Sequence, residues 1–308
     1  MAFAVRRDAR RESFDCVLAS VLMNIGEAGA RTERQKHTIL LTMTHFHNQP
    51  EILNFLRHLG TVKVPAVDEV HFAVTDNSGN WQPEVAVGSN VSIYRPPNNL
   101  GYLNGCAFAL ESWRRGHGLM PDWVGVVNTD LEFRQNFFQL LRAWSIPEDV
   151  AIVAPDILLP SGQRQNPHLI DRPDKRRMRW YCQIFRNRFL GRIYLIAHSL
   201  RKQSSKWWVP ESSHANPVGI YAPHGSAFFV SRTFFEAGGR LEYGSFLYGE
   251  ELHIAEQARR LDMKVLWAPF LSIRHYEHST TSTLSIAKRL EWMSQSYTYI
   301  LGEYFQSD

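Results

Sequence analysis

The sequence predicts an α/β fold built on a doubly wound, mostly parallel sheet flanked by helices. Between residues 37 and 130, short apolar runs rich in β-branched residues alternate with amphipathic segments. This alternation is typical of strand–helix–strand units, whose right-handed crossovers join parallel strands. Three of the apolar runs end in polar clusters, THFHN, TDNSGN and NTD. Ligands bind at the carboxyl ends of the strands in such sheets, so the pattern also predicts where a site lies.

The first predicted strand, His37 to Met43, is a continuous apolar run, as expected of a strand buried on both faces. Pro50 then opens an amphipathic helix, and Gly60 ends it. The remaining elements expected in this half are strands at 69–74, 91–94 and 123–127 and a helix at 106–115.

The second half alternates less regularly. Apolar runs predict strands at 150–154, 225–230 and 264–267, and amphipathic stretches predict helices that begin at 233, cover 250–261 and cover 285–305. The expected organisation is an N-terminal extension over 1–36 with an amphipathic helix, one α/β domain over 37–280, and a C-terminal helix within 281–308. The sequence does not decide whether that last helix packs on its own domain or on a second subunit of a homo-oligomer.

The composition is that of an ordinary folded protein, with 44% hydrophobic and 21% charged residues. No segment approaches the roughly 20 consecutive apolar residues that a membrane-spanning helix needs. The three cysteines lie far apart and form neither a metal-ligand spacing nor a disulfide framework. This usage of cysteine favours a reducing, cytoplasmic location.

One segment carries most of the positive charge. Residues 172–206 contain eleven Lys or Arg and one acid, Asp174, a local charge of +10 in a chain whose net charge is +4. Arginine alternates there with aromatic and aliphatic residues, which is the composition of an amphipathic element on anionic lipid. We expect 172–210 to be a basic helical insertion that faces a lipid-linked acceptor or the inner face of the plasma membrane. A solvated face or an oligomer contact would also explain it, and no nucleic-acid motif accompanies it.

Five residues have the right chemistry for a site, although each also has a structural explanation. Asp130 follows a buried strand, where a carboxylate can hold a divalent cation or cap a helix. Asp76 ends another strand, where it can bind a nucleotide or close an Asx turn. Glu250 and Glu251 stand at the start of a predicted helix. One of them can act as a general base, or the helix dipole alone can explain two acidic residues there. His275 is a candidate nitrogen ligand.

Further motifs join these residues in a fixed order. They are Asn99-Leu100-Gly101-Tyr102 with Gly105, Asn128-Thr129-Asp130, Gly225-Ser226-Ala227-Phe228, and Phe246 through Glu251 before His275. In this order and at these intervals, over roughly residues 37 to 280, the chain resembles the inverting family 2 glycosyltransferases. The likeness is greatest to their rhamnosyltransferase-like and galactofuranosyltransferase-like branch. The resemblance implies the GT-A fold, one α/β domain around a nucleotide-binding sheet.

The resemblance also implies a role for each residue. Donor-binding residues would be Thr44, Asp76, Asn99, Gly101, Asn128 and Asp130. Asp130 and His275 would hold Mn²⁺ or Mg²⁺, and Glu251, with Glu250 as the alternative, would be the catalytic base. Acceptor-side residues would be Gly225, Ser226, Tyr248 and His253. The implied reaction is metal-dependent inverting transfer of a hexosyl group from a UDP- or dTDP-sugar to a hydroxyl of a lipid-linked or polysaccharide glycan, as in cell-wall or surface polysaccharide biosynthesis.

The chain departs from the family pattern at three places. Asn128 replaces the first acid of the family's DxD motif, which weakens the expected hold on a metal. Glu250-Glu251-Leu252-His253 stands where the family usually has Glu-Asp-x-Asp, so the placement of the base is open between the two glutamates. Ala107 stands where the family often has Asn.

Two other functions compete with the transferase. A sugar nucleotidyltransferase would share the sheet and the metal, but the segment after the first strand lacks a glycine-rich phosphate loop. A catalytically degenerate sugar-nucleotide-binding or scaffold protein of the same fold would explain Asn128 and His253. A dehydrogenase or a P-loop enzyme is disfavoured because the chain has neither GxGxxG after a strand nor GK[ST].

Overall fold

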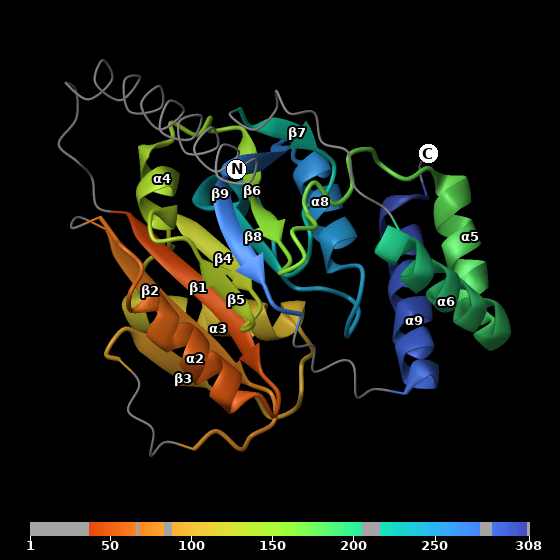
Figure 1. Ribbon diagram of the computed structural model, residues 1–308, viewed down its shortest axis with the longest axis horizontal. Helices are drawn as coiled ribbons and strands as arrows, with labels where there is room; N and C mark the ends of the chain where they lie inside the picture. The colour runs from red at the N-terminus through yellow and green to blue at the C-terminus, as the bar shows by residue number, and fades with distance from the viewer. Residues whose placement is uncertain (1–36, 66–67, 83–87, 205–215, 278–284, 307–308) are drawn as a thin grey trace, which may run out of the picture.

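The computed structural model describes residues 37–65, 68–82, 88–204, 216–277 and 285–306, with side chains described except at 198–204. The amphipathic helix expected within residues 1–36 lies outside the described residues. The described strands form one sheet in the order β3-β2-β1-β4-β8-β6-β9-β5, and β7 also pairs with β9. Helices cover both faces of this sheet (Figure 1).

The strands are β1 (Thr38–His45), β2 (Glu69–Asp76), β3 (Val91–Tyr94), β4 (Trp123–Val127), β5 (Leu131–Phe133), β6 (Val150–Leu158), β7 (Val218–Ile220), β8 (Ala227–Ser231) and β9 (Lys264–His275). The helices are α2 (Gln49–Leu59), α3 (Leu103–His117), α4 (Phe137–Ala143), α5 (Lys175–Arg186), α6 (Arg188–Ser204), α7 (Arg232–Glu236), α8 (Glu250–Arg260) and α9 (Ile286–Tyr304).

The sheet is mixed and mostly parallel, as predicted. β1 pairs in parallel with β2 and β4, β2 pairs in parallel with β3, and β6 pairs in parallel with β9. β8 is antiparallel to both β4 and β6 and thereby joins the two parallel groups. Six of the nine described strands therefore run in one direction, and their carboxyl ends lie at one edge.

The core lies on both faces of the sheet, because successive residues of a strand point to opposite faces. On β1, Leu40 packs on one face in a cluster that includes Trp113 of α3. Ile39 and Leu41 pack on the other face in a cluster that includes Phe55 of α2. All three β1 residues are buried, which explains why the sequence reads there as a continuous apolar run.

Helices α5, α6 and α9 form a separate layer beside the sheet (Figure 1). Their contacts centre on Ile184, Phe185 and Leu290, with Gly191 of α6 lying close against Leu290. Both the predicted helical insertion and the predicted C-terminal helix are therefore present. In this structure α9 packs on α5, α6 and α8 of its own chain. No helix within the described ranges is long and apolar enough to cross a membrane.

The structure adds elements that the sequence pattern did not predict. β5 and β7 have three residues each, and α4 has seven, too few for a clear periodicity. β9 continues to His275, whereas the apolar pattern predicted an end near Trp267. A register irregularity opposite Pro155 and Asp156 lets the pairing of β9 with β6 resume after residue 268.

Candidate active site

The pair of Asp130 and His275 is brought together by two strands. β5 pairs antiparallel with the end of β9, with Leu131 opposite His275, and the Tyr276 N–H donates to the Asp130 carbonyl oxygen at 3.0 Å. The Nε2 atom of His275 lies 3.2 Å from Oδ1 of Asp130. Both side chains are less than a tenth exposed. Two residues that are 145 positions apart therefore form one site.

The other nitrogen of the His275 ring is held by a chain of hydrogen bonds. The Gln165 Nε2 amide donates to Glu277 Oε1 at 2.9 Å, which turns Gln165 Oε1 toward His275 Nδ1 at 2.6 Å. An amide oxygen only accepts, so Nδ1 must carry the proton. In the neutral ring, Nε2 then presents a lone pair toward the Asp130 carboxylate.

This donor set fits a divalent cation. A lone pair facing a carboxylate oxygen is an unfavourable arrangement unless a proton or a cation lies between them, and a metal-ligating histidine ordinarily donates its other N–H to an acceptor as His275 does. Among the described residues, no three His, Cys, Asp or Glu side chains converge into a larger metal-holding group. Asp130 and His275 are the candidate ligands in these ranges, and two protein ligands would suit a cation shared with phosphate oxygens and water.

Glu250 and Glu251 open α8 but have different surroundings. Glu250 is buried, and its Oε1 accepts the Tyr248 N–H at 2.9 Å. Burial, with the neighbouring charge of Glu251, raises the pKa of Glu250 to about 8. The Glu251 side chain is 25% exposed, with Oε1 3.7 Å from His168 Nε2. Gly225 lies beside it, since a Cβ placed there would be 3.5 Å from Glu251 Oε2. Glu251 is therefore the accessible carboxylate.

A row of histidines connects the two carboxylates. The rings of His168 and His224 have centroids 5.2 Å apart, and those of His224 and His275 are 6.3 Å apart. His168 contacts Glu251 at one end and His275 contacts Asp130 at the other. Ser226 hydrogen-bonds to His224, and the Asn128 N–H donates to the Ser226 carbonyl oxygen at 2.8 Å. The predicted residues Asn128, Gly225 and Ser226 thus lie in the same region.

Tyr102 lies between these groups. Its hydroxyl donates to the Gly225 carbonyl oxygen at 3.2 Å. Burial raises the pKa of Tyr102 well above its usual value, and the charges of Asp130, Glu250 and Glu251 add to the effect. Tyr102 therefore connects the start of α3 to the segment of Gly225 through one hydrogen bond.

The loop before α8 has an unusual backbone. Tyr248 has φ +71° and Gly249 has φ +78°, and a left-handed conformation at a tyrosine is uncommon. The Tyr243 hydroxyl holds this turn by donating to the Tyr248 carbonyl oxygen at 2.8 Å. The Tyr248 hydroxyl is itself buried and has no hydrogen-bond partner in the part of the chain that the structure describes. Strain and an unmatched hydroxyl at one residue are features typical of a functional loop.

Two of the predicted donor-side residues, Thr44 and Asp76, lie at the ends of β1 and β2. Asp76 is buried, and its carboxylate accepts from the N–H groups of Gly79 and Trp81 and from Arg95. Burial alone would raise the pKa of Asp76, but the hydrogen bonds from Trp81 and Arg95 outweigh it and lower that pKa. The donors to Asp76 in this structure come from its own turn and from Arg95, and its contact with a nucleotide base remains a prediction.

The glycine-rich turn before α3 is fixed to β2 and to the loop before α8. Asn77 accepts the Leu100 N–H and donates to the Gly101 carbonyl oxygen, while Asn99 accepts the Gly101 N–H. Gly101 has φ +79°, and a Cβ there would clash with the Phe246 carbonyl oxygen. A side chain is therefore excluded at Gly101 for two independent reasons.

Close packing and hydrogen bonds hold the start of α3 in place. A Cβ at Gly105 would clash with Thr44, the predicted donor-side residue at the end of β1. Asn104 accepts the Tyr243 N–H at 2.7 Å and donates to the carbonyl oxygens of Tyr243 and Ser245. The loop that leads to Glu250 and Glu251 is thus tied to the start of α3.

His253 does not join the acceptor side. It is buried, its Nδ1 lies 2.7 Å from the Tyr304 hydroxyl and its Nε2 lies 2.9 Å from Gln257. Burial lowers its pKa to about 4. Side chains two positions apart on an α-helix point to roughly opposite faces. His253 therefore lies on the side of α8 that packs against α9, away from Glu251.

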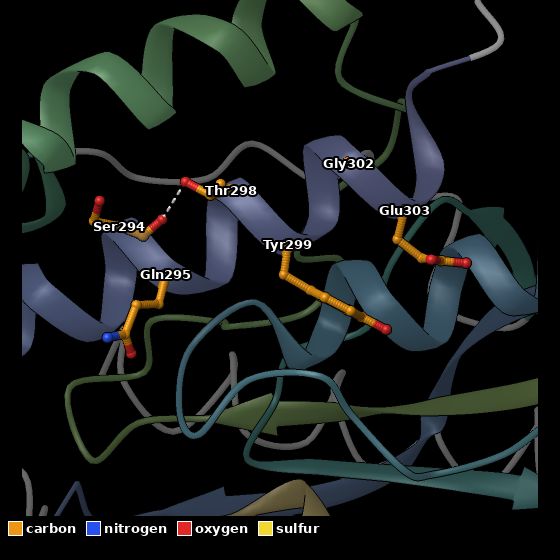
Figure 2. A pocket seen from close by; sticks show the side chains of 6 residues that line it. All are labelled: Ser294, Gln295, Thr298, Tyr299, Gly302 and Glu303. Atoms are coloured by element: carbon orange, nitrogen blue, oxygen red, sulfur yellow. Dashed lines mark hydrogen bonds between the residues drawn. The ribbon is translucent and has the colours of Figure 1, made fainter.

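Two hollows lie away from these residues. One of about 570 Å³ is lined by Ser294, Gln295, Thr298, Tyr299, Gly302 and Glu303 along α9 (Figure 2). Figure 2 shows the Tyr299 side chain extending from α9 toward α8. The other, of about 460 Å³, lies between α2 and the strands β2 and β3 and has an apolar lining. Neither includes a predicted site residue.

Sequence reasoning missed several residues of this region. His168, His224 and Gln165 lie in irregular segments, where no periodic pattern marks a single polar residue. Asn77 follows Asp76 in the polar cluster TDNSGN, and Asn104 directly precedes Gly105; these positions were the available signals. Nothing in the sequence marks Arg95 as a site residue, because it meets Asp76 only in the folded chain.

No family model matches this chain, and no curated protein sequence matches it. Among solved structures it is similar to GalNAc-T7, crystallised with UDP, GalNAc and Mn²⁺, with 14% identity and a TM-score of 0.52. That match covers 84% of this chain and 48% of GalNAc-T7, so the chain spans about half of that protein's length. S. aureus TarS residues 1–349 match with 10% identity and a TM-score of 0.47, over 78% of this chain and 60% of that one. The likeness to GalNAc-T7 shows that the chain has the GT-A fold.

Proposed function

We propose that this GT-A-fold chain is a glycosyltransferase that moves a sugar from a UDP- or dTDP-sugar to a hydroxyl acceptor. The observation that carries the proposal is the arrangement of Asp130, His275 and Glu251 around the carboxyl-end edge of the sheet. A ligand pair for a cation and an accessible carboxylate are linked there by the row of His168 and His224. The crystal structure of GalNAc-T7, which shares the fold, contains UDP and Mn²⁺ and supports the choice of donor.

Asp130 and His275 would hold Mn²⁺ or Mg²⁺, which would neutralise negative charge on the leaving diphosphate. Gln165 supports this role by fixing the tautomer of His275. On the donor side, Asn99 and Gly101 shape the turn at the start of α3, and Thr44 lies against Gly105 of that helix. Asp76 ends β2, and Asn128 follows β4. The resemblance assigns these residues to the nucleotide.

Glu251 is proposed as the base. It takes the proton of the acceptor hydroxyl while that oxygen forms a bond to the anomeric carbon. The bond from the anomeric carbon to the diphosphate oxygen breaks, and its electron pair leaves with the diphosphate. A single displacement of this kind inverts the configuration. Glu250 is less suited, because its raised pKa keeps it protonated at neutral pH and its carboxyl is occupied by the Tyr248 N–H.

The acceptor would enter beside Gly225, which lies next to the partly exposed Glu251 carboxylate. The unmatched hydroxyl of Tyr248 and the polar Ser226 are candidates for binding it. A lipid-linked or polysaccharide glycan, a rhamnosyl- or galactofuranosyl-type transfer and a position at the cytoplasmic face of a membrane belong to the same proposal. They rest on the family resemblance and on the basic segment.

The first experiment is thermal stability of the purified chain against UDP-, dTDP- and GDP-sugars, each with Mn²⁺ and with chelator. A ligand that binds only the native state raises Tm, by an amount equivalent to about 2.7 kcal/mol at 100 times its Kd. We expect one nucleotide to raise Tm in the presence of Mn²⁺ and to lose most of that effect with chelator. Equal shifts with and without chelator would contradict the cation site.

Asp130→Ala separates an enzyme from a binding protein. In a transferase, this variant loses both the Mn²⁺-dependent shift and the transfer or hydrolysis of the donor. Glu132→Ala is the matched control, since Glu132 lies two residues away and pairs with Arg274 and Tyr276 instead. A chain that binds nucleotide but turns over no donor would be the degenerate binding or scaffold protein. Turnover that persists in Asp130→Ala would show that the metal ligands are elsewhere.

A further inference from the structure

The α5–α6 hairpin has an apolar face on each side. Toward the protein, Gly191, Tyr194 and Leu195 of α6 pack with Leu290 of α9 and with α5. Away from it, Phe189 is 71% exposed and Ile193 is 49% exposed. These two lie four residues apart and therefore share one helix face. Leu190 of α6 and Trp180 of α5, whose ring lies 5.8 Å from that of Tyr194, are also about half exposed.

Both helices also carry exposed basic side chains. Arg176, Arg179 and Arg186 of α5 and Arg188 and Arg192 of α6 are all exposed. No ion pair links any of these five to an acid in the described residues, and the nearest acid in sequence, Asp174, instead caps α5 through the Arg177 N–H. Within the described residues, no acidic side chain forms an ion pair with these arginines, and Phe189 and Ile193 stay exposed to solvent.

We propose that this outward surface, defined by Trp180, Phe189, Leu190, Ile193 and the five arginines, docks on an anionic lipid bilayer. Exposed aromatic and aliphatic side chains would enter the boundary between headgroups and acyl chains, and the arginines would bind lipid phosphates. The exposed face of a soluble helix is ordinarily polar, so apolar residues on both faces of α6 require a second partner.

Charge complementarity selects lipid over the other partners. A symmetric contact between two copies would set arginine against arginine, since the same surface is used twice. A nucleic acid would match the arginines but would leave Phe189 and Ile193 against a charged backbone. An anionic bilayer offers phosphate and apolar surface together.

The hairpin is also connected to the proposed active site. α6 packs on α9, and Trp292 of α9 contacts the Phe246 ring, with centroids 4.7 Å apart. Phe246 belongs to the loop before Glu250 and Glu251 and lies against Gly101. The docking surface does not depend on transferase activity, but it would hold the loop before α8 near a membrane.

Sedimentation of the full chain with vesicles tests the proposal. Neutral phosphatidylcholine vesicles are compared with vesicles containing phosphatidylglycerol, at low and high salt. We expect binding to the anionic vesicles only, weakened by salt. Arg188→Glu/Arg192→Glu should lower the partition coefficient roughly 30-fold or more, from about 1 kcal/mol per basic residue. Phe189→Ser/Ile193→Ser should also abolish most binding.

Matched controls lie in other parts of the chain. Arg57→Glu/Lys63→Glu changes the net charge by the same amount on and just after α2, and Leu119→Ser removes an apolar residue that is 44% exposed. Both should bind vesicles as the unmodified chain does, and all variants should keep the unmodified Tm. The proposal is overturned if anionic vesicles do not bind the unmodified chain, or if the control pair loses as much binding as the hairpin pair. It is also overturned if the hairpin variants change only oligomeric mass or RNA binding.

Discussion

Gln165 accepts a hydrogen bond from Nδ1 of His275 at 2.6 Å and so determines which ring nitrogen faces Asp130. The orientation of Gln165 is itself fixed, since its amide nitrogen donates to Glu277. None of these three residues is close to Gln165 in sequence. The candidate metal site therefore depends on a residue that is not a ligand.

Gln165→Leu should weaken Mn²⁺ binding in the presence of UDP by about 10- to 100-fold, the usual effect of removing a hydrogen bond behind a ligating histidine. The cause is that the His275 ring loses both its preferred tautomer and its orientation. Isothermal titration or the Mn²⁺ resonance signal measures the affinity directly. Gln135→Leu, at an exposed position, is the control. Unchanged Mn²⁺ affinity in Gln165→Leu would show that His275 does not bind the cation.

Glu251→Gln should reduce kcat by about 10²- to 10⁴-fold with little change in donor affinity, because the variant cannot accept a proton from the acceptor. Glu250→Gln should reduce kcat much less, since that carboxyl is buried and holds the Tyr248 N–H. Initial rates at saturating donor and the donor Kd separate the two effects. A larger loss of kcat in Glu250→Gln than in Glu251→Gln would reverse the assignment of the base.

Glu250 should also make stability depend on pH. Its pKa in the folded chain is about 8, raised from an ordinary 4.5, so between these values the native state holds a proton that the unfolded chain releases. Its contribution to the free energy of unfolding is complete below pH 4.5 and falls as pH rises toward 8. Glu250→Gln should gain at least about 1 kcal/mol relative to the unmodified chain between pH 5 and pH 8. Urea unfolding at both pH values measures the difference, and a constant difference would exclude a buried, protonated Glu250.

Gly101→Ala and Gly118→Ala form a matched pair. Both glycines have a left-handed backbone conformation, with φ +79° and +68°. Only at Gly101 would an added Cβ clash with a backbone atom, the Phe246 carbonyl oxygen. Gly118→Ala should cost about 1 kcal/mol of stability, the ordinary penalty for alanine in that conformation. Gly101→Ala should cost more than this and should also lower donor affinity, because the turn and the loop before α8 must separate. Equal costs would show that the close contact is not needed.

The positions of the strands could be predicted from the sequence where the strands are buried on both faces. β1 and β4 are buried over nearly their whole length, so their apolar runs marked them, and the alternation with α2 and α3 indicated parallel pairing. The order of β8, β6 and β9 was not predictable, because pairing between segments far apart in sequence leaves no local pattern. The prediction ended β9 near Trp267, whereas the strand runs to His275, and the register irregularity between Pro155 and Asp156 of β6 that accompanies the longer strand is a property of the folded sheet.

The site was predictable only as a set of motifs. Asp130 and His275 were paired through the family resemblance, and the structure brings them within 3.2 Å of each other. His253 was assigned to the acceptor side through the family resemblance, whereas in the structure its ring bonds Tyr304 on the α9 side of α8. His168 and Gln165 were identified only from their distances to Glu251 and His275 in the structure. A single polar residue in a loop belongs to no periodic sequence pattern that could mark it.

The antiparallel pairing of β4 with β8 has a consequence for synthesis. Val127 of β4 pairs with Ala227 of β8, so one edge of β4 finds its partner only after about 100 further residues. At ribosomal rates of about 5–20 residues per second, that edge waits roughly 5–20 s. The parallel group β3-β2-β1-β4 emerges early with an unpaired apolar strand, which is the kind of edge that recruits other chains. Chaperone dependence of the nascent chain should therefore be greatest while residues 128–231 are being translated.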